Sequence, residues 1–297
     1  MRVQGVRLAA VAAVSGLALA VPASANHSWG GYHWASTTAG SLTLDVLTSN
    51  SSYWETAIAG SVSDWNSPVV GGAPDVLTLR RTASSADRKR CSPIAGKTLV
   101  CNYTYGKRGW LGIASIWLSS GHISQATTKL NDSYYQPGSR YDTPAWRNMV
   151  ACQEVGHDFG LAHQNENFTN ANVGSCMDYT NNPDGGGTNG TLSNRRPNAH
   201  DYDQLATIYG TADSYNSATT GVVTNFGIRQ VGQAAARGQT EGSGDSPAEW
   251  GTAVHRDGNG RPDQFVRRYS DGTQMITHVL WAPNVNGVKA HDDDHVE

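Results

Sequence analysis

Residues 153–163 read QEVGHDFGLAH, and this stretch carries the clearest chemical pattern in the chain. Gln153 and His157 are four positions apart, so on an α-helix both side chains project from one face. Gly160 is expected to end the helix, because glycine readily adopts the left-handed conformation that turns the chain. His163 can then return toward His157. A metal ion could be held between these two histidines and the group at position 153.

The helix is expected to begin at Asp142-Thr143-Pro144, a capping residue followed by proline near the first helical position. Residues that then share one helix face are Trp146, Met149, Val150, Gln153 and His157. Glu154 lies beside this face, where a carboxylate can take a proton from a metal-activated water.

The stretch resembles the metzincin zinc-protease signature H-E-x-x-H-x-x-G-x-x-H. The matching fixed positions are Glu154, His157, Gly160 and His163, and Gln153 stands where the signature has its first histidine. The resemblance implies an α+β zincin catalytic domain, with a twisted mixed sheet and an active-site helix. It further implies a Zn²⁺-dependent endopeptidase with His157 and His163 as ligands, Gln153 at the variant ligand position and Glu154 as general base.

A second resemblance concerns Ser175-Cys176-Met177-Asp178-Tyr179. It is similar to the Met-turn S-x-M-x-Y of astacin-like and serralysin-like enzymes and to the M-D-Y of pappalysins. The resemblance implies that Met177 underlies the metal site and that Tyr179 stabilises the transition state. Taken alone, Met177 would be interpreted as an ordinary core methionine.

Gln153 leaves three hypotheses open, because a glutamine amide oxygen is a poor zinc ligand. Zinc is bound by His157, His163 and a third group, which is the Gln153 oxygen, a water or another side chain; the available histidines are His33, His122 and His200. Alternatively, the metal is lost and the protein binds peptides or a partner without cutting them. In the third hypothesis, another metal or weak metal binding supports slow hydrolysis. The presence of Glu154 favours a working site.

The four cysteines allow three pairings. The local choice is Cys91–Cys101 and Cys152–Cys176; a zinc-thiolate cluster is disfavoured because the chain has no C-x-x-C pair. The second bridge would connect the active-site helix to the Met-turn and add about 3 kcal/mol by restricting the unfolded chain.

The first residues resemble a secretory signal peptide, with Arg2 and Arg7 before the short apolar run 8–21 and the small-residue site Ala23-Ser24-Ala25. The alternative is a short membrane anchor, but the run is too short to span comfortably. We therefore predict cleavage after Ala25, a secreted protein that permits disulfides, and no membrane partner after cleavage. The net charge of -3 argues against nucleic-acid binding, and the expected partner is a peptide or protein substrate.

The predicted organisation is a signal peptide (1–25), a catalytic domain (26–212), a linker (213–221) and a small Gly-rich β section with an acidic tail (222–297). Strands are expected at 42–47, 74–79, 97–103, 110–118 and 123–130, helices at 51–65 and 201–209, and a hairpin from 264–266 and 275–281. The apolar run 110–118 resembles the metzincin edge strand that binds peptide, although it equally suits an interior strand. Residues 257–263 resemble a calcium loop, but a Gly-rich β-turn is favoured because this run supplies few of the oxygens that Ca²⁺ needs.

Overall fold

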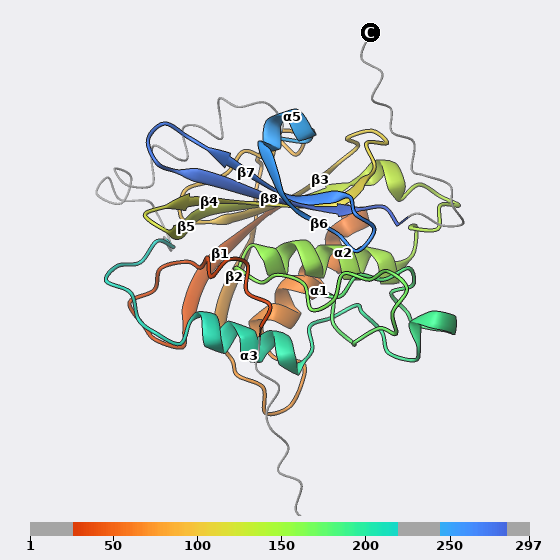
Figure 1. Cartoon of the computed structure of the whole chain (residues 1–297), viewed down its shortest axis with the longest axis horizontal. Coiled ribbons are helices and arrows are strands. Elements are labelled where there is room, and N and C mark those ends of the chain that lie inside the picture. The colour runs from red at the N-terminus through yellow and green to blue at the C-terminus, as the bar shows by residue number, and fades with distance from the viewer. Residues whose placement is uncertain (1–25, 219–243, 284–297) are drawn as a thin grey trace, which may run out of the picture.

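The computed structural model of the chain describes residues 26–218 and 244–283. The predicted signal peptide, the last residues of the predicted linker and the acidic tail lie outside the described residues. Figure 1 shows the described chain as a sheet with its longer helices on one face.

The sheet has eight strands in the order β2-β1-β3-β5-β4-β8-β7-β6. The first four strands in this order, β2, β1, β3 and β5, run parallel to one another. The remaining pairs, β5–β4, β4–β8, β8–β7 and β7–β6, are antiparallel. Their bounds are β1 Leu42–Ser49, β2 Leu77–Ala83, β3 Thr98–Tyr103, β4 Trp110–Ser119, β5 His122–Asn131, β6 Thr252–Arg256, β7 Pro262–Arg268 and β8 Gln274–Trp281. The predicted α+β class with a mixed sheet is therefore confirmed.

Helix α1 (Ser52–Asn66) connects the parallel strands β1 and β2. Parallel neighbours need such a crossover, because the chain must return to the edge of the sheet where the first strand began, and a tight turn is too short to do this. The helix buries Trp54, Ile58, Val62 and Trp65, which share one face because they recur at helical spacing.

Helix α2 (Pro144–His157) lies on the same face of the sheet as α1 (Figure 1) and packs against α1, β4, β5 and β8. The Thr143 side chain accepts a hydrogen bond from the Trp146 amide, and Pro144 occupies the first turn, as predicted from the sequence. Shorter elements complete the fold: η1 Asp132–Tyr134, η2 Gly187–Asn189, α3 Ala199–Ile208 and α5 Pro247–Trp250. None of the helices in the described ranges is both long and apolar enough to cross a bilayer.

The C-terminal strands continue the sheet formed by β1 to β5, because β8 pairs with β4 from Trp110↔Trp281 to Leu118↔Gln274. Since β5 pairs with the other side of β4, the interpretation of 110–118 as a peptide-binding edge strand is wrong. The apolar run is explained by burial: every residue of β4 except Ser119 is buried. The start of the predicted linker is also held in place, because the Asp213 amide donates to the Ser36 carbonyl.

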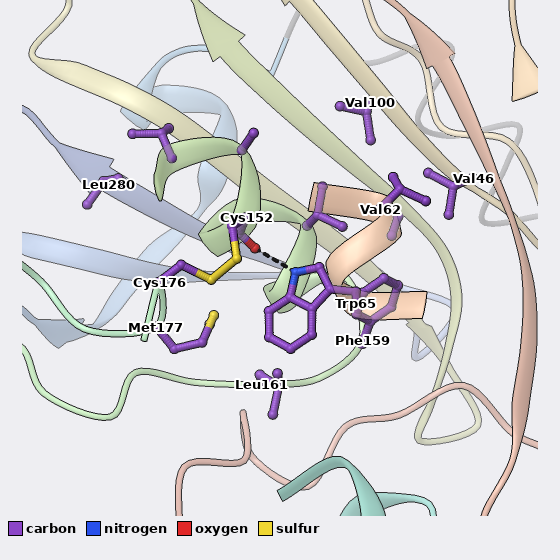
Figure 2. Packing of buried hydrophobic residues seen from close by; sticks show 14 of the residues in the cluster. Val46, Val62, Trp65, Val100, Cys152, Phe159, Leu161, Cys176, Met177 and Leu280 are labelled. Atoms are coloured by element: carbon purple, nitrogen blue, oxygen red, sulfur yellow. Dashed lines mark hydrogen bonds between the residues drawn. A yellow bond between two sulfur atoms is a disulfide. The ribbon is translucent and has the colours of Figure 1, made fainter. Parts of the chain in front are cut away.

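Both expected disulfides, Cys91–Cys101 and Cys152–Cys176, are formed. Figure 2 shows the second bridge beside Met177 and Trp65, whose indole Nε1 donates to the Cys152 carbonyl over 3.0 Å. Gly156 of α2 makes this arrangement possible, because a Cβ there would lie 2.7 Å from Met177 Sδ and 2.8 Å from Trp65 Cζ2. The disulfide therefore ties helix α2 to the segment that carries Met177.

Candidate metal centre

Three imidazoles converge at the end of α2: His157, His163 and His278. Their candidate ligand nitrogens lie within 4.8 Å of one another, and the Nε2 atoms of His157 and His163 are 3.1 Å apart. His157 is the last residue of α2, and His278 lies in the middle of β8. The chain turns between His157 and His163 at Gly160, whose φ is +94° and whose Cβ would lie only 2.0 Å from the Tyr32 carbonyl oxygen. No other residue fits this position.

The hydrogen bonds of two of these rings orient lone pairs toward a shared point. His157 Nδ1 donates to the Leu161 carbonyl over 2.7 Å, and His163 Nδ1 donates to Glu166 Oε1 over 3.1 Å. When Nδ1 carries the proton of a neutral imidazole, Nε2 carries a lone pair. Two lone pairs facing each other at 3.1 Å repel unless a cation lies between them. A histidine whose other nitrogen donates to a carbonyl or carboxylate is the usual arrangement of a metal ligand.

Burial keeps two of these imidazoles neutral. It lowers the pKa of His157 well below the usual range, and the neighbouring His278 and His163 add to the effect. Burial also lowers the pKa of His278 well below its usual range, with His163 and His255 contributing. Three histidine imidazoles are a ligand set that Zn²⁺ commonly takes, with a fourth position open for water or substrate. The residues present therefore fit zinc.

His278 is the functional residue that the sequence did not reveal. It is separated from His163 by most of the C-terminal half of the chain and stands alone in the apolar strand QMITHVLW. Its Nε2 is 3.0 Å from the Tyr179 hydroxyl, and this hydroxyl donates to Asp263 Oδ2 over 3.1 Å. His278 Nδ1 has no hydrogen-bond partner among the described residues. A lone histidine in a strand pattern gives no signal of this convergence.

Gln153 contacts the Met-turn. Its side-chain Nε2 donates to the Cys176 carbonyl over 2.9 Å, while its Oε1 is buried and has no partner in the described ranges. The residue therefore connects α2 to the segment that is also joined to it by the Cys152–Cys176 bridge. The predicted roles of His33, His122 and His200 as a third ligand are not supported by their positions, because none of them belongs to the cluster around His157 and His163.

Glu154 is fully buried close to His278, and neither of its carboxylate oxygens has a hydrogen-bond partner among the described residues. Its Oε2 lies 3.9 Å from His278 Nδ1. Burial raises the pKa of Glu154 well above its usual range, and the nearby Asp158 adds to the rise. Gly112 of β4 makes room for this side chain, because a Cβ there would lie 2.7 Å from Glu154 Cγ. An unpartnered buried carboxylate is costly, which indicates a function other than stability.

The segment 175–179 packs against the cluster through Tyr179. Met177 is completely buried, and its backbone carbonyl accepts from the Gln164 amide over 2.7 Å. The ring of Tyr179 lies 4.3 Å from that of His163, measured between centroids. Asp201 of α3 fixes the turn, because its Oδ2 accepts from the Ser175 hydroxyl over 2.6 Å.

Two carboxylates lie at or near the connection between β6 and β7: Asp257 in the turn and Asp263 in β7. Asp257 Oδ1 accepts from the amides of Asn259 and Arg261, each over 2.9 Å, as in a compact turn. Asp263 instead faces the histidine cluster, and its Oδ1 accepts from His255 Nδ1 over 2.8 Å. These contacts are those of a β-turn, and they give no support to the calcium-loop alternative.

A cleft of about 160 Å³ opens onto the cluster. The N-terminal residues Ser28, Trp29 and Gly30 form one wall, and Glu166, His255 and Asp263 form another. The Trp29 amide donates to the Gly160 carbonyl over 2.7 Å, which holds this segment against the turn that positions His163. The cluster is therefore reachable from solvent at one side and buried at the other.

No protein-family model and no curated protein matches this sequence. Solved structures that are similar to it include high choriolytic enzyme 1, a hatching-enzyme zinc protease from the medaka fish Oryzias latipes, and myroilysin. The first is 12% identical with a TM-score of 0.31, covering 60% of this chain and 94% of the other. The second is 12% identical with a TM-score of 0.33, covering 63% of this chain and 99% of the other. Similarities this weak carry no argument by themselves, so the function of this chain has to be inferred from the geometry of the site.

Proposed function

We propose that this chain is a zinc-dependent endopeptidase in which His157, His163 and His278 hold the metal and Glu154 is the general base. The observation that carries the proposal is the convergence of three imidazoles next to a buried carboxylate that has no other partner in the described structure. When bound, Zn²⁺ supplies a Lewis acid that polarises the peptide carbonyl and lowers the pKa of water toward about 7.

Glu154 would accept a proton from the attacking water and pass it to the leaving amine. Its position next to His278 and its lack of competing hydrogen bonds suit this role. The cleft beside Trp29 would admit an extended peptide. The partner is therefore proposed to be a peptide or protein substrate.

Gln153, predicted as the variant metal ligand, is proposed instead to position the Met-turn. Its amide group already donates to the Cys176 carbonyl, and an imidazole is a far better zinc ligand than an amide oxygen. In this proposal His278 supplies from a distant strand the third ligand that the helix does not supply.

Tyr179 was predicted to stabilise the transition state, a role that needs a hydroxyl able to reach the substrate. Here that hydroxyl contacts Asp263 and His278, so we propose that Tyr179 orients His278. Tyr179→Phe separates the two roles. A lower zinc affinity supports the orienting role, whereas a lower kcat with unchanged zinc affinity supports the transition-state role.

The central test uses the predicted secreted chain, residues 26–297. Zinc is measured by elemental analysis and cleavage by casein hydrolysis, with and without a chelator. We expect His278→Gln to lower the zinc content by one equivalent per chain and Gln153→Ala to leave it unchanged. The opposite pattern would show that Gln153 is the ligand.

Glu154→Gln distinguishes an enzyme from a binding protein on the same fold. We expect it to keep its zinc and to lose at least about 10²-fold in cleavage rate, because a general base contributes 10²–10⁴-fold. Bound zinc with no cleavage attributable to Glu154 would support the alternative of a catalytically silent peptide-binding protein. Secretion is tested separately, by N-terminal sequencing of protein recovered from the medium; the expected first residue is Asn26.

A further inference from the structure

A second group of metal-ligand side chains lies apart from the candidate active site: His33, His122 and Asp213. His122 Nε2 is 3.1 Å from Asp213 Oδ1, and His33 Nε2 is 3.4 Å from Asp213 Oδ2. The two imidazole rings meet edge to face with centroids 4.8 Å apart. All candidate ligand atoms of the group lie within 4.8 Å of one another.

These residues come from three segments that are far apart in the sequence. His33 lies in the N-terminal segment, His122 begins β5 after the β4–β5 turn, and Asp213 follows α3. Backbone contacts hold the segments together: the Ile123 amide donates to the His33 carbonyl over 2.8 Å, and the Asp213 amide donates to the Ser36 carbonyl over 2.7 Å. The fold itself therefore brings the three side chains to one point.

Both histidines are anchored through Nδ1, which leaves Nε2 pointing at the carboxylate. His33 Nδ1 donates to the Gly31 carbonyl over 3.0 Å, and His122 Nδ1 donates to the Ser120 carbonyl over 3.2 Å. In neutral imidazoles each Nε2 then carries a lone pair that faces a carboxylate oxygen. This arrangement is repulsive unless both rings are protonated or a cation lies between the three groups. An Nδ1–H bound to a backbone carbonyl is the arrangement that orients metal-ligating histidines.

The dimensions also suit a small transition-metal ion. Ligand bonds of about 2.0–2.1 Å in a tetrahedral zinc site place neighbouring ligand atoms about 3.3 Å apart. The distances of 3.1 Å from His122 Nε2 to Asp213 Oδ1 and 3.4 Å from His33 Nε2 to Asp213 Oδ2 are close to this spacing, and a small rotation of the carboxylate would present one of its two oxygens to an ion held by both rings. The side chains are 21%, 22% and 17% exposed, so water can reach the group and supply a fourth ligand.

We propose that His33 Nε2, His122 Nε2 and an Asp213 carboxylate oxygen form a second metal site, suited to Zn²⁺ with water completing the coordination. The site would clamp the N-terminal segment to the β4–β5 turn. The same segment carries Trp29 and Gly30, which line the cleft at the candidate active site. The second metal would thus hold a wall of the cleft in place without touching a substrate. Its existence does not depend on the proposed peptidase activity.

The test is the metal stoichiometry of the chain 26–297 after chelator treatment, reconstitution with Zn²⁺ and removal of unbound metal. The variants are His33→Gln, His122→Gln and Asp213→Asn. His200→Gln is the control, because His200 is a partly buried histidine outside both groups. We expect each of the three variants to hold one equivalent of zinc fewer than the parent chain and His200→Gln to hold the same amount.

Repeating the series in the His278→Gln background separates this inference from the proposed function. If the candidate active site also binds zinc, the parent chain holds two equivalents and the His278→Gln chain one, which the three variants reduce to none. If the active-site proposal fails, the parent chain holds one equivalent, and the three variants still remove it. Reconstitution with Co²⁺ gives an independent readout, since the second site should contribute visible absorption that each variant abolishes.

Two results would overturn the site. Unchanged zinc in all three variants would leave imidazolium–carboxylate ion pairs as the explanation of the group. Loss of zinc in the histidine variants but not in Asp213→Asn would indicate ordinary surface chelation by two histidines. Thermal unfolding of each variant with added Zn²⁺ guards against misfolding: the parent chain is stabilised by a larger shift in Tm than the variants.

Discussion

Gly112→Ala should impair catalysis through Glu154 while leaving the metal in place. A Cβ at this position of β4 would lie 2.7 Å from Glu154 Cγ, 2.8 Å from Oε1 and 2.9 Å from Cδ. Non-bonded carbon atoms settle at about 3.5–4.0 Å, so the carboxylate group must move by roughly 1 Å. The strand itself has little reason to yield, because β4 is paired on both sides.

The size of the effect follows from that displacement. Misplacing a reacting group by 1 Å can cost about 10²-fold in rate, which is about 2.7 kcal/mol of transition-state stabilisation. We therefore expect kcat/KM for a fluorogenic peptide to fall about 10²-fold. Zinc content should stay the same, because Gly112 contacts Glu154 rather than a histidine of the cluster.

Two comparisons make this prediction sharp. Gly60→Ala is the matched control, since a Cβ on Gly60 of α1 meets no described atom within 4 Å; its activity should equal that of the parent. In a Glu154→Gln background, Gly112→Ala should add no further loss, because residues that act through one group are not additive. Undiminished kcat/KM in Gly112→Ala, or an equal further loss in the Glu154→Gln background, would refute the reasoning.

Three further predictions concern the support of the site. Gly156→Ala should lower the free energy of unfolding by about 1–3 kcal/mol, because the added methyl group overpacks the contact with Met177. Gly60→Ala should raise it by up to about 1 kcal/mol, because alanine favours the helix. Urea unfolding measures both changes, and equal shifts would contradict the close contact of α2 with Met177. Replacing Cys152 and Cys176 together by serine should cost about 3–4 kcal/mol, the loop-closure value for a sequence separation of 24; a change in the urea midpoint equivalent to less than about 1 kcal/mol would show that the bridge adds little. Asp201→Ala should destabilise by about 3 kcal/mol, because it removes the acceptor shared by the Gln164 amide, the buried Ser175 hydroxyl and the Asn198 backbone amide; thermal unfolding at parent values would contradict this role.

Local sequence signals predicted the helix that carries the site. Pro144 and the capping residue before it mark the start of α2, and Gly160 marks the turn after it, because each residue type suits one backbone conformation. The bridge Cys152–Cys176 was also predictable, since both cysteines flank the motif residues. These features depend on neighbours in the chain, which a single sequence displays.

The pairing of β4 with β8 could not be predicted from such local signals. An apolar run indicates burial on both faces but does not say which strand lies beside it, so 110–118 was equally compatible with an edge and an interior strand. The structure places β8 against it and thereby brings His278 to the site. A strand pairing between distant segments leaves no local pattern, and for this reason the sequence offered His33, His122 and His200 as the third imidazole instead of His278 in β8.

Gln153 departs from the motif, and its interpretation changes between the sequence and the structure. On the helix Gln153 shares a face with His157, and the sequence therefore predicts that it is a weak metal ligand. In the structure its side-chain amide donates a hydrogen bond to the Cys176 carbonyl. A histidine at this position that bound a metal through one ring nitrogen could make the same bond only with its other ring nitrogen. His278 meanwhile approaches from the sheet, with Tyr179 and Asp263 behind it. In the proposed site the third ligand therefore comes from the sheet, because a metal needs only the direction and distance of a ligand, whereas Gln153 makes the contact that holds the turn.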